Sequence, residues 1–420
     1  MGKPAVYSLP DTGNPPGEGL RPLRLAVFVT HPIQYFAPMF RRLARRPEIE
    51  LTVLYASLIG AEPYRDTGFG RTLAWDIPML EGYRYRVLKN YRPRKTEGFF
   101  SFLSPGIIRE ISRERYDAVI VFGWACLTSW LAFAGARLSS VPLMLYGDSI
   151  PLFEGANGRL KAALKTLLLG SLFRRTSAFL VMGKLNRAFY ESYGAPASKT
   201  FFVPYPVDND FFTLRAERAR EHREALRARY GIPPEAVLLL FVGKLVRRKR
   251  PQDLLAVLRR LQPSLPYLGA VFVGEGELRP WLEAEVARGG MRNTFLLGFK
   301  NQTELPEVYA ISDMLVLPSM REPWGLVTNE AMACGLPVVV SNMTGAGVDI
   351  VRGDDNGFVY PCGDIAALEK IIRRLAADAE LRGRMGQRSK EIIRSFSYEQ
   401  CVEGILKATR SATKGRVAGA

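Results

Sequence analysis

The chain has 420 residues, of which 47% are hydrophobic and 24% charged, which is typical of globular proteins and long enough for two domains with sizeable cores. Its net charge of +17 indicates anionic partners such as nucleotides or a phospholipid surface, but no zinc-finger, recognition-helix or aromatic RNA-binding signature accompanies it, so we expect no nucleic-acid partner. Four widely spaced cysteines and two histidines cannot form a paired zinc motif, and we expect reduced thiols in a cytoplasmic protein.

Both ends of the chain differ from the rest. Residues 1–20 are rich in Pro and Gly, and residues 411–420 are small, polar and basic, so we expect disordered tails. Neither an apolar core nor a small-residue cleavage site follows Met1, and we expect no signal peptide. The longest apolar run, 118–136, is interrupted by Gly and polar residues and begins as a buried strand, so we expect no membrane span there.

Strands alternate with helices through the first half of the chain. An apolar strand over 23–29 is followed by the turn THPIQYF and a helix over 37–45. Further strands are predicted over 51–55, 118–122, 142–146 and 178–182, separated by helical patterns. This alternation predicts a parallel sheet covered by helices on both faces.

The second half repeats the scheme. Strands are predicted over 236–242, 269–273, 294–297, 314–317 and 337–340, alternating with helices such as 251–261 and 279–288. The fold class is therefore α/β, with two Rossmann-like, doubly wound parallel-sheet domains. We predict an N-terminal domain over 21–207, a linker with a charged helix (217–230) over 208–235, a C-terminal domain over 236–395 and a final helix over 396–410. Ligands of open parallel sheets bind beyond the carboxyl ends of the strands, which predicts an inter-domain cleft with the active site.

The most informative stretch is REPWGLVTNEAMACGLPVVV, residues 321–340. It places two carboxylates, Glu322 and Glu330, around a junction of loop and helix, with Pro323 and Gly325 in the loop and a helix over 326–334. A helix N-terminus offers unpaired N–H groups and partial positive charge to phosphate, and nearby acids can accept hydrogen bonds from sugar hydroxyls. The pattern indicates a ligand that is part phosphate and part sugar.

A basic turn follows the strand over 236–242. Gly243 permits a tight turn, and four cations follow within six positions, from which we select Lys244 and Lys249 as phosphate-binding residues. A solvated basic loop is the alternative interpretation. A second glycine turn, GEG in VGEGELR, is weak evidence by itself.

The order FVGKLVRRK, FVGEGELR, FLLGF, SDMLVLPS and EPWGLVTNEAMACGLPVV resembles the donor domain of glycosyltransferase family 4, of GT-B architecture, from residue 238 to about 359. The resemblance implies retaining transfer of a hexose-type sugar from a UDP- or GDP-sugar, with no metal and no cofactor. In that architecture the last helix, here 396–410, crosses back to the first domain.

The resemblance also implies roles for individual residues. Two lysines match the diphosphate-binding cations that stabilise the leaving group: Lys249 and Lys244, the second of which is an arginine in many relatives. Glu322 matches the acid that contacts the donor sugar, and Glu330 matches the acid that holds the ribose. The resemblance further implies that the backbone of Trp324, Gly325 and Leu326 lies beside the sugar and phosphate. Gly243 would belong to the phosphate-binding turn, and Phe299 would lie beside the base.

The acceptor side is less marked. The loop THPIQYFAP departs from the commonest family pattern, a glycine pair, and its His31 can donate to a phosphate or orient an acceptor hydroxyl. Asp148 follows a parallel strand and can orient the acceptor. Loop bonding by His31 and helix capping by Asp148 are the alternatives. Asp66 and the pair Trp75–Asp76 are weaker acceptor-side candidates.

Two basic segments with apolar residues indicate what kind of molecule carries the acceptor. Residues 92–110 and 158–175 combine cations with Phe or Leu, which favours contact with an anionic membrane, although a helix covering a sheet also needs an apolar face. We therefore expect a glycan or lipid-linked acceptor, in cell-surface polysaccharide or glycolipid synthesis, and a cytoplasmic protein that is peripheral at the inner membrane face. A sugar-nucleotide epimerase and an inactive GT-B binding protein remain alternatives; a glycosidase would need carboxylates flanking one bond.

Overall fold

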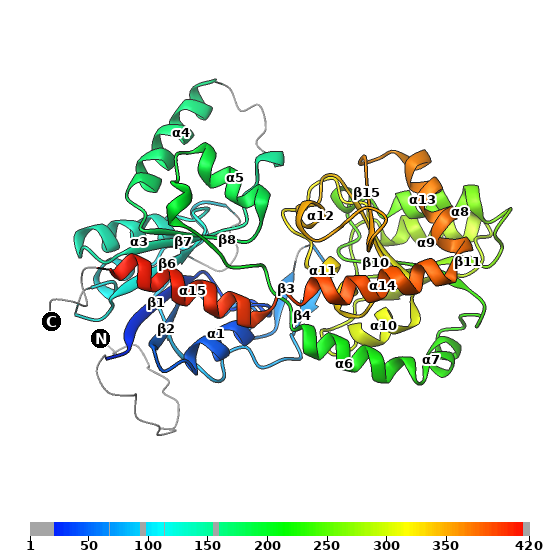
Figure 1. Cartoon of the computed structure of the whole chain (residues 1–420), viewed down its shortest axis with the longest axis horizontal. Helices are drawn as coiled ribbons and strands as arrows, with labels where there is room; N and C mark the ends of the chain where they lie inside the picture. The colour runs from blue at the N-terminus through cyan, green and yellow to red at the C-terminus, as the bar shows by residue number, and fades with distance from the viewer. Residues whose placement is uncertain (1–20, 67, 93–97, 113, 154–158, 415–420) are drawn as a thin grey trace. The chain divides into compact units, whose positions relative to one another are not determined.

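The computed structural model describes residues 21–414 apart from 67, 93–97, 113 and 154–158 (Figure 1). The tail predicted over 1–20 and the last six residues of the tail predicted over 411–420 lie outside the described residues. The chain divides into two compact units. Unit 1 holds the chain up to Tyr64, Pro78–Tyr205 and the chain from Tyr398, and unit 2 holds Arg65–Ile77 and Pro206–Ser397.

Unit 1 is built on a parallel sheet. Within the described residues its strand order is β5 (Arg84–Val87), β2 (Ile49–Tyr55), β1 (Leu23–Val29), β6 (Ala118–Phe122), β7 (Leu143–Tyr146), β8 (Ala178–Val181) and β9 (Thr200–Phe202). The strand order reverses direction between β1 and β6, which pair in parallel with Leu25 beside Ala118. Such a reversal opens a crevice at the carboxyl ends of the two strands.

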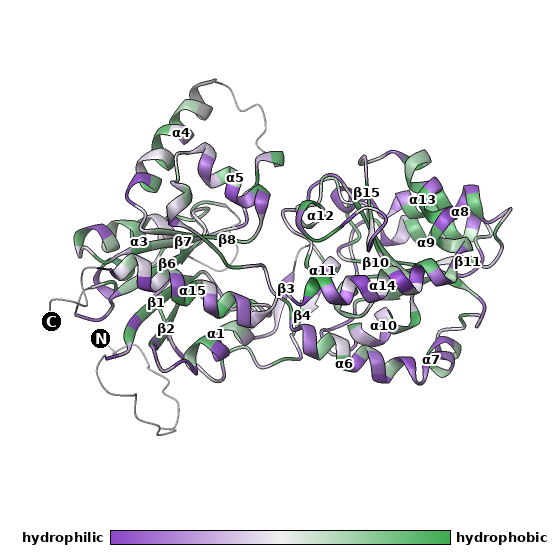
Figure 2. Ribbon diagram, in the orientation of Figure 1, coloured by the Kyte–Doolittle hydropathy of each residue, from purple (hydrophilic) through white to green (hydrophobic). Residues whose placement is uncertain are grey.

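Both faces of this sheet are buried, as expected for a parallel sheet. Along β1, Leu25 and Val27 enter one core and Ala26 and Phe28 the other, because successive side chains point to opposite faces. The covering helices are α1 (Ala37–Ala44), α2 (Ile107–Glu110), α3 (Leu127–Leu138), α4 (Arg159–Arg174), α5 (Lys184–Ser192) and α15 (Tyr398–Thr413), with short 3-10 turns at Pro151–Phe153 and Ala197–Lys199. The strands are coloured mainly as hydrophobic, whereas the helices alternate (Figure 2).

The last helix, α15, belongs to the core of unit 1. It packs beside α1 on the face that holds Leu25 and Val27, and Cys401 and Leu406 are buried there. The Tyr398 hydroxyl donates to the Tyr35 carbonyl oxygen at 2.9 Å.

Unit 2 also contains a parallel sheet. In the described residues its order is β12 (Thr294–Gly298), β11 (Leu268–Val273), β10 (Val237–Val242), β13 (Met314–Leu317), β14 (Val338–Ser341) and β15 (Gly357–Tyr360). Its helices are α6 (Asn209–Arg220), α7 (Arg223–Arg229), α8 (Gln252–Leu261), α9 (Arg279–Arg288), α10 (Leu305–Ile311), α11 (Leu326–Ala333), α12 (Ala346–Asp349), α13 (Ile365–Ala377) and α14 (Ala379–Ile393), with a 3-10 turn at Arg247–Lys249. The reversal of strand order lies between β10 and β13.

The predicted strands are present in both sheets, with ends shifted by up to two residues, whereas five details differ from the sequence-based expectation. β5, β9 and β15 were not predicted, and neither was the hairpin of β3 (Tyr64–Asp66) and β4 (Arg71–Leu73). The charged helix predicted over 217–230 is two helices, α6 and α7. In α7, Arg227 is buried and donates to Asp313 and to the Ile311 carbonyl, which ties this helix to unit 2. Among the described residues, no helix is long and apolar enough to cross a membrane.

Candidate functional site

The predicted donor-side residues gather where the strand order of unit 2 reverses. The loop after β10 carries Gly243, Lys244 and Lys249, and the loop after β13 leads to Glu322. Because the carboxyl ends of parallel strands lie at one edge of a sheet, two loops far apart in sequence become neighbours there.

Two glycine turns shape the backbone of this edge. The Gly243 N–H donates to the Val273 carbonyl at 2.9 Å, so the turn after β10 rests on the turn after β11. A Cβ on Gly274 would lie 2.0 Å from the Gly243 carbonyl oxygen, and one on Gly276 2.5 Å from the Leu245 carbonyl oxygen. The motif GEG, weak evidence in the sequence, therefore permits a close approach of two backbones that holds the Lys244 loop in place.

Lys249 and Glu322 form an ion pair across the reversal point. Their side chains are both largely buried, and Glu322 also accepts a hydrogen bond from the Ser319 hydroxyl at 3.4 Å. Burial, together with the charges of Arg248 and Lys244, lowers the pKa of Lys249 to about 7. The structure thus brings together a cation and a carboxylate that the sequence separates by 73 residues.

The backbone around Glu322 is fixed on both sides. The Glu322 N–H donates to the Met343 carbonyl at 3.1 Å, and the Gly345 N–H donates to the Glu322 carbonyl at 2.9 Å. Gly325 precedes α11 with φ of 95°, a left-handed conformation that favours glycine. Trp324 is buried, and its indole N–H donates to Asn329 Oδ1 at 2.9 Å, so its ring is held inside the protein; Leu326 is half-buried. The predicted role of the backbone of Trp324, Gly325 and Leu326 stays a prediction.

Glu330 lies one turn into α11 and is fully buried. The Tyr309 hydroxyl donates to Glu330 Oε2 at 2.6 Å. A ribose could reach this carboxylate only after the surrounding side chains move, because it has no exposed surface in this structure. The ribose-binding role of Glu330 stays a prediction.

Lys244 is held by the segment Arg65–Ile77, which lies in unit 2 although it precedes that unit's main part in sequence. Its ammonium lies 2.8 and 3.1 Å from the two carboxylate oxygens of Asp66, and 4.8 Å from the centroid of the Phe69 ring. The ring of Phe299, predicted beside the base, lies 5.4 Å from Phe69 and 6.2 Å from Trp75. Asp66 and Trp75, weak acceptor-side candidates in the sequence, thus contact the predicted donor-side residues.

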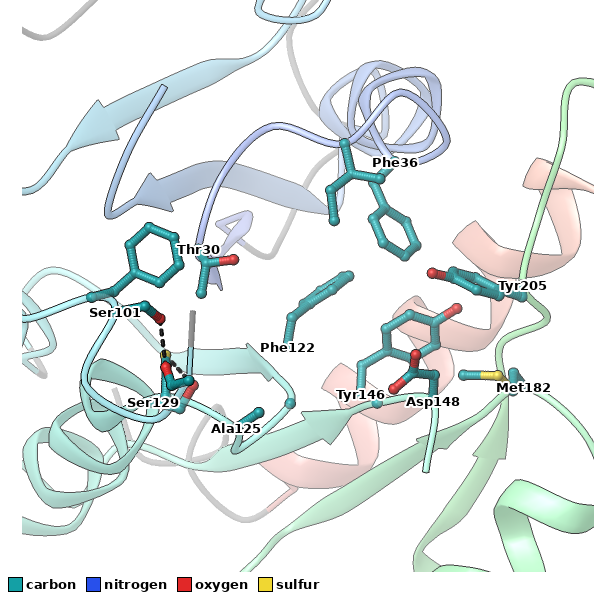
Figure 3. Close-up of a pocket in the computed structure, with 16 residues that line it drawn as sticks. Thr30, Phe36, Ser101, Phe122, Ala125, Ser129, Tyr146, Asp148, Met182 and Tyr205 are labelled. Carbon is teal, nitrogen blue, oxygen red and sulfur yellow. Dashed lines mark hydrogen bonds between the residues drawn. The ribbon is translucent and has the colours of Figure 1, made fainter. Parts of the chain in front are cut away.

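Unit 1 has a pocket of about 380 Å³ at its own reversal point, between the ends of β1, β6 and β7 (Figure 3). This volume lies in the range of small-molecule sites, about 300–1,000 Å³. Phe36, Phe122, Tyr146 and Tyr205 form an aromatic wall, with Phe122 centred 4.9 Å from both Phe36 and Tyr146. Asp148 lies beside this wall in the close-up.

The two predicted acceptor-side residues have different positions. Asp148 lines the pocket, and part of its side chain contacts solvent. Because the surrounding protein still removes much of the water around the carboxyl group, desolvation raises its pKa above the ordinary value. His31 is half-buried and does not line the pocket, but it contacts two residues that do: its ring is stacked on Phe102 at 6.3 Å between centroids, and its Nδ1 lies 2.9 Å from the Thr30 hydroxyl. Burial lowers the pKa of His31, which keeps the imidazole neutral at pH 7.

Sequence reasoning missed the aromatic wall and the contact of Asp66 with Lys244. A signal for the wall was available, because Phe36 belongs to the THPIQYF turn and Tyr146 stands two residues before Asp148 at a strand end. No local pattern predicts the pairing of Asp66 with Lys244, since 178 residues separate them. In the part of the chain that the structure describes, no three His, Cys, Asp or Glu side chains are grouped so as to hold a metal ion.

Residues 222–392 match the family model described as glycosyl transferases group 1. Among curated proteins, a D-inositol 3-phosphate glycosyltransferase of Xylanimonas cellulosilytica is 32% identical over 231 residues, which cover 54% of this chain and 54% of that protein. The chain spans about half the length of the D-inositol 3-phosphate glycosyltransferases that it matches.

Solved structures resemble the chain over nearly all of its length. HepE of Anabaena in complex with UDP-glucose has a TM-score of 0.68 at 16% identity, covering 93% of this chain and 100% of that one. WaaG, a glycosyltransferase involved in lipopolysaccharide biosynthesis, has a TM-score of 0.63 at 18% identity, covering 93% and 100%. At such identities the likeness shows the fold alone, and it confirms the predicted class of two Rossmann-like domains of GT-B type.

Proposed function

We propose that this protein is a retaining glycosyltransferase that moves a hexose-type sugar from a UDP- or GDP-sugar to a hydroxyl acceptor, a proposal supported by the match of residues 222–392 to the model of group 1 glycosyl transferases. The observation that carries the proposal is the Lys249–Glu322 pair at the reversal point of unit 2, with Lys244 on the same loop. This arrangement offers cations to a diphosphate and a carboxylate to a sugar hydroxyl at one place.

On the donor side, Lys244 and Lys249 neutralise the charge that grows on the β-phosphate as the nucleoside diphosphate leaves. The N–H groups at the start of α11, next to Gly325, add partial positive charge. Glu322 accepts a hydrogen bond from the donor sugar when the phosphate draws Lys249 away from it, and Phe299 lies beside the base. Glu330 holds the ribose once it becomes accessible.

In the transfer step the acceptor oxygen forms a bond to the anomeric carbon on the face that the phosphate leaves. The bond between that carbon and the phosphate oxygen breaks with its electron pair, and the departing oxygen takes the acceptor proton. Atoms and charge therefore balance without a protein base. We propose that neither a metal ion nor a cofactor takes part, since two lysines and a helix N-terminus supply positive charge at the leaving group.

On the acceptor side, we propose that the pocket of unit 1 holds the acceptor. Aromatic side chains such as Phe36 and Tyr146 can stack on an apolar ring face, and Asp148 can accept from a hydroxyl. His31 orients the loop that forms one side of the pocket. The involvement of WaaG in lipopolysaccharide biosynthesis supports a glycan or lipid-linked acceptor, and we propose a place in cell-surface polysaccharide or glycolipid synthesis.

The donor test is a thermal-shift panel of UDP-, GDP- and ADP-sugars, followed by a transfer assay. A ligand that binds only the folded protein raises the midpoint of thermal unfolding. At a ligand concentration 100 times the dissociation constant, the free energy of unfolding increases by about 2.7 kcal/mol. We expect a shift with a UDP- or GDP-sugar and release of the nucleoside diphosphate when an acceptor is added. No shift with any nucleotide sugar would contradict the proposal, and conversion of the donor to another sugar nucleotide would favour the epimerase.

We also propose that unit 1 binds an anionic membrane through α4, as a peripheral protein at a cytoplasmic membrane face. The face of α4 that covers the sheet is apolar: Leu169, Leu172 and Phe173 pack into the core there. Three other leucines of this helix stay exposed, by 54% at Leu164, 66% at Leu167 and 45% at Leu168. The sequence of α4 contains no acidic residue, and Arg174 and Arg175 stand at its end, so its charge complements anionic lipid.

We expect the double variant L167N/L168N to lose most of its co-sedimentation with phosphatidylglycerol vesicles at low salt. Each buried leucine contributes about 1.5–3 kcal/mol, so two removed contacts weaken binding by at least tenfold. Leu214→Asn on α6, where the leucine is 56% exposed, is the matched control and should bind like wild type. Equal binding of the double variant, or no binding of wild type, would overturn the membrane proposal.

A further inference from the structure

The segment Arg65–Ile77 is attached to unit 2 at several points besides Lys244. Asp76 accepts from the Thr303 backbone N–H at 3.1 Å, and the Asn301 side-chain amide donates to the Ala74 carbonyl at 2.7 Å. The aromatic contacts of Phe69 and Trp75 with Phe299 add an apolar attachment. The segment therefore stays in place independently of the Asp66–Lys244 pair.

Asp66 is prepared for its contact with Lys244 by the backbone. Its Oδ1 accepts from the Gly68 and Phe69 N–H groups at 2.8 and 2.9 Å, which fixes the carboxylate in a turn. Lys244 lies directly across this turn, since a Cβ on Gly68 would be 2.6 Å from the ammonium. Burial opposes ionisation, but the hydrogen bonds from Lys244 and the two N–H groups lower the pKa of Asp66, so the carboxylate is charged at pH 7.

The pair is only partly shielded from water, with Lys244 28% and Asp66 17% exposed. Such a pair is worth about 0.5–1 kcal/mol, whereas a diphosphate brings more than one negative charge. A diphosphate can therefore replace Asp66 as the partner of Lys244. After the diphosphate has taken the place of Asp66 beside Lys244, the Asp66 carboxylate remains in the neighbouring turn and repels the negatively charged ligand.

We propose that Asp66 competes with the donor diphosphate for Lys244 and so sets the affinity of the site for nucleotide. The inference rests on the proposed function, because it takes Lys244 as a diphosphate-binding residue. Donor binding then exchanges one anion for another at Lys244, while the contacts of Asp76 and Phe69 keep the segment attached. Asp66 is a residue that determines donor affinity and takes no part in bond cleavage.

The test is Asp66→Asn, because the Asn side-chain oxygen can keep the two backbone hydrogen bonds while the charge is lost. We expect UDP and inorganic pyrophosphate to bind this variant about two- to fivefold more tightly than wild type, as expected for the loss of one partly exposed ion pair. The donor KM should fall by a similar factor with kcat unchanged. In a Lys244→Gln background the gain in affinity should be smaller, because competition for the lysine is gone and only the repulsion between Asp66 and the phosphates is removed.

The control is Asp354→Asn, which removes the same charge from unit 2 at an exposed pair with Arg374, beside the amino end of β15. It should leave affinity for pyrophosphate as in wild type. Equal or weaker pyrophosphate binding by Asp66→Asn would overturn the inference, as would no binding to either protein. The nucleotide-sugar panel on wild type decides the proposed function separately, so the two failures are distinguishable.

Discussion

Replacing Lys249 by methionine is expected to lower the rate of sugar transfer by about 10²–10³-fold, the usual cost of removing one preorganised group that stabilises leaving-group charge. The variant also leaves Glu322 without its cation in a largely buried position. Single-turnover rates at saturating donor measure the effect on the chemical step. A variant within threefold of wild type would show that Lys249 does not stabilise the leaving group.

Lys249→Arg is the control, because it keeps the charge. In wild type the pKa of Lys249, about 7, means that the free protein loses this positive charge as the pH rises from 6 to 8. Affinity for a UDP-sugar, whose phosphates are ionised throughout this range, should then fall about tenfold. The arginine variant stays charged and should show a flat profile. A flat wild-type profile would mean that Glu322 keeps the lysine protonated.

Gly274→Ala is expected to destabilise unit 2 by about 3–5 kcal/mol. Its φ of 133° is strained for any residue with a Cβ, and that atom would lie 2.0 Å from the Gly243 carbonyl oxygen, so the two turns must separate. The midpoint of thermal unfolding should fall by about 10 °C, and nucleotide binding should weaken because the Gly243 turn places Lys244.

The matched control is Gly383→Ala in α14, where a Cβ meets no atom within 4 Å. There alanine should stabilise the helix by up to about 1 kcal/mol. If both alanine variants unfolded at the wild-type temperature, the close approach of the two turns would not contribute to stability.

The sequence predicted the architecture because both sheets are parallel and buried on both faces. β6 and β13 are continuous apolar runs, and their predicted ends agree with the structure. β5 reads RYRV and β15 begins with glycine, so neither shows the apolar run of a central strand, and each lies at an edge of its sheet. Edge strands bury less surface, and their sequences are correspondingly less distinctive.

The positions of the two turns that carry the proposed donor-side residues could be predicted because their sequence signals are local. Gly243 and Lys244 follow one strand directly, and Gly325 precedes one helix. What could not be predicted is which charges meet, as with Lys249 and Glu322, or Lys244 and Asp66. Such contacts depend on which loops the strand order brings together. The aromatic wall of unit 1 likewise combines Phe36, Phe122 and Tyr205 from three separate parts of the chain.

The position of α15 has a consequence for the order of events during synthesis. One face of the sheet of unit 1 is closed by Cys401, Ile405 and Leu406, residues that leave the ribosome after the whole of unit 2. Domains generally fold as units while the chain emerges. Unit 2 can thus reach its native core while unit 1 still exposes an apolar sheet face, which is covered only when the last helix is made.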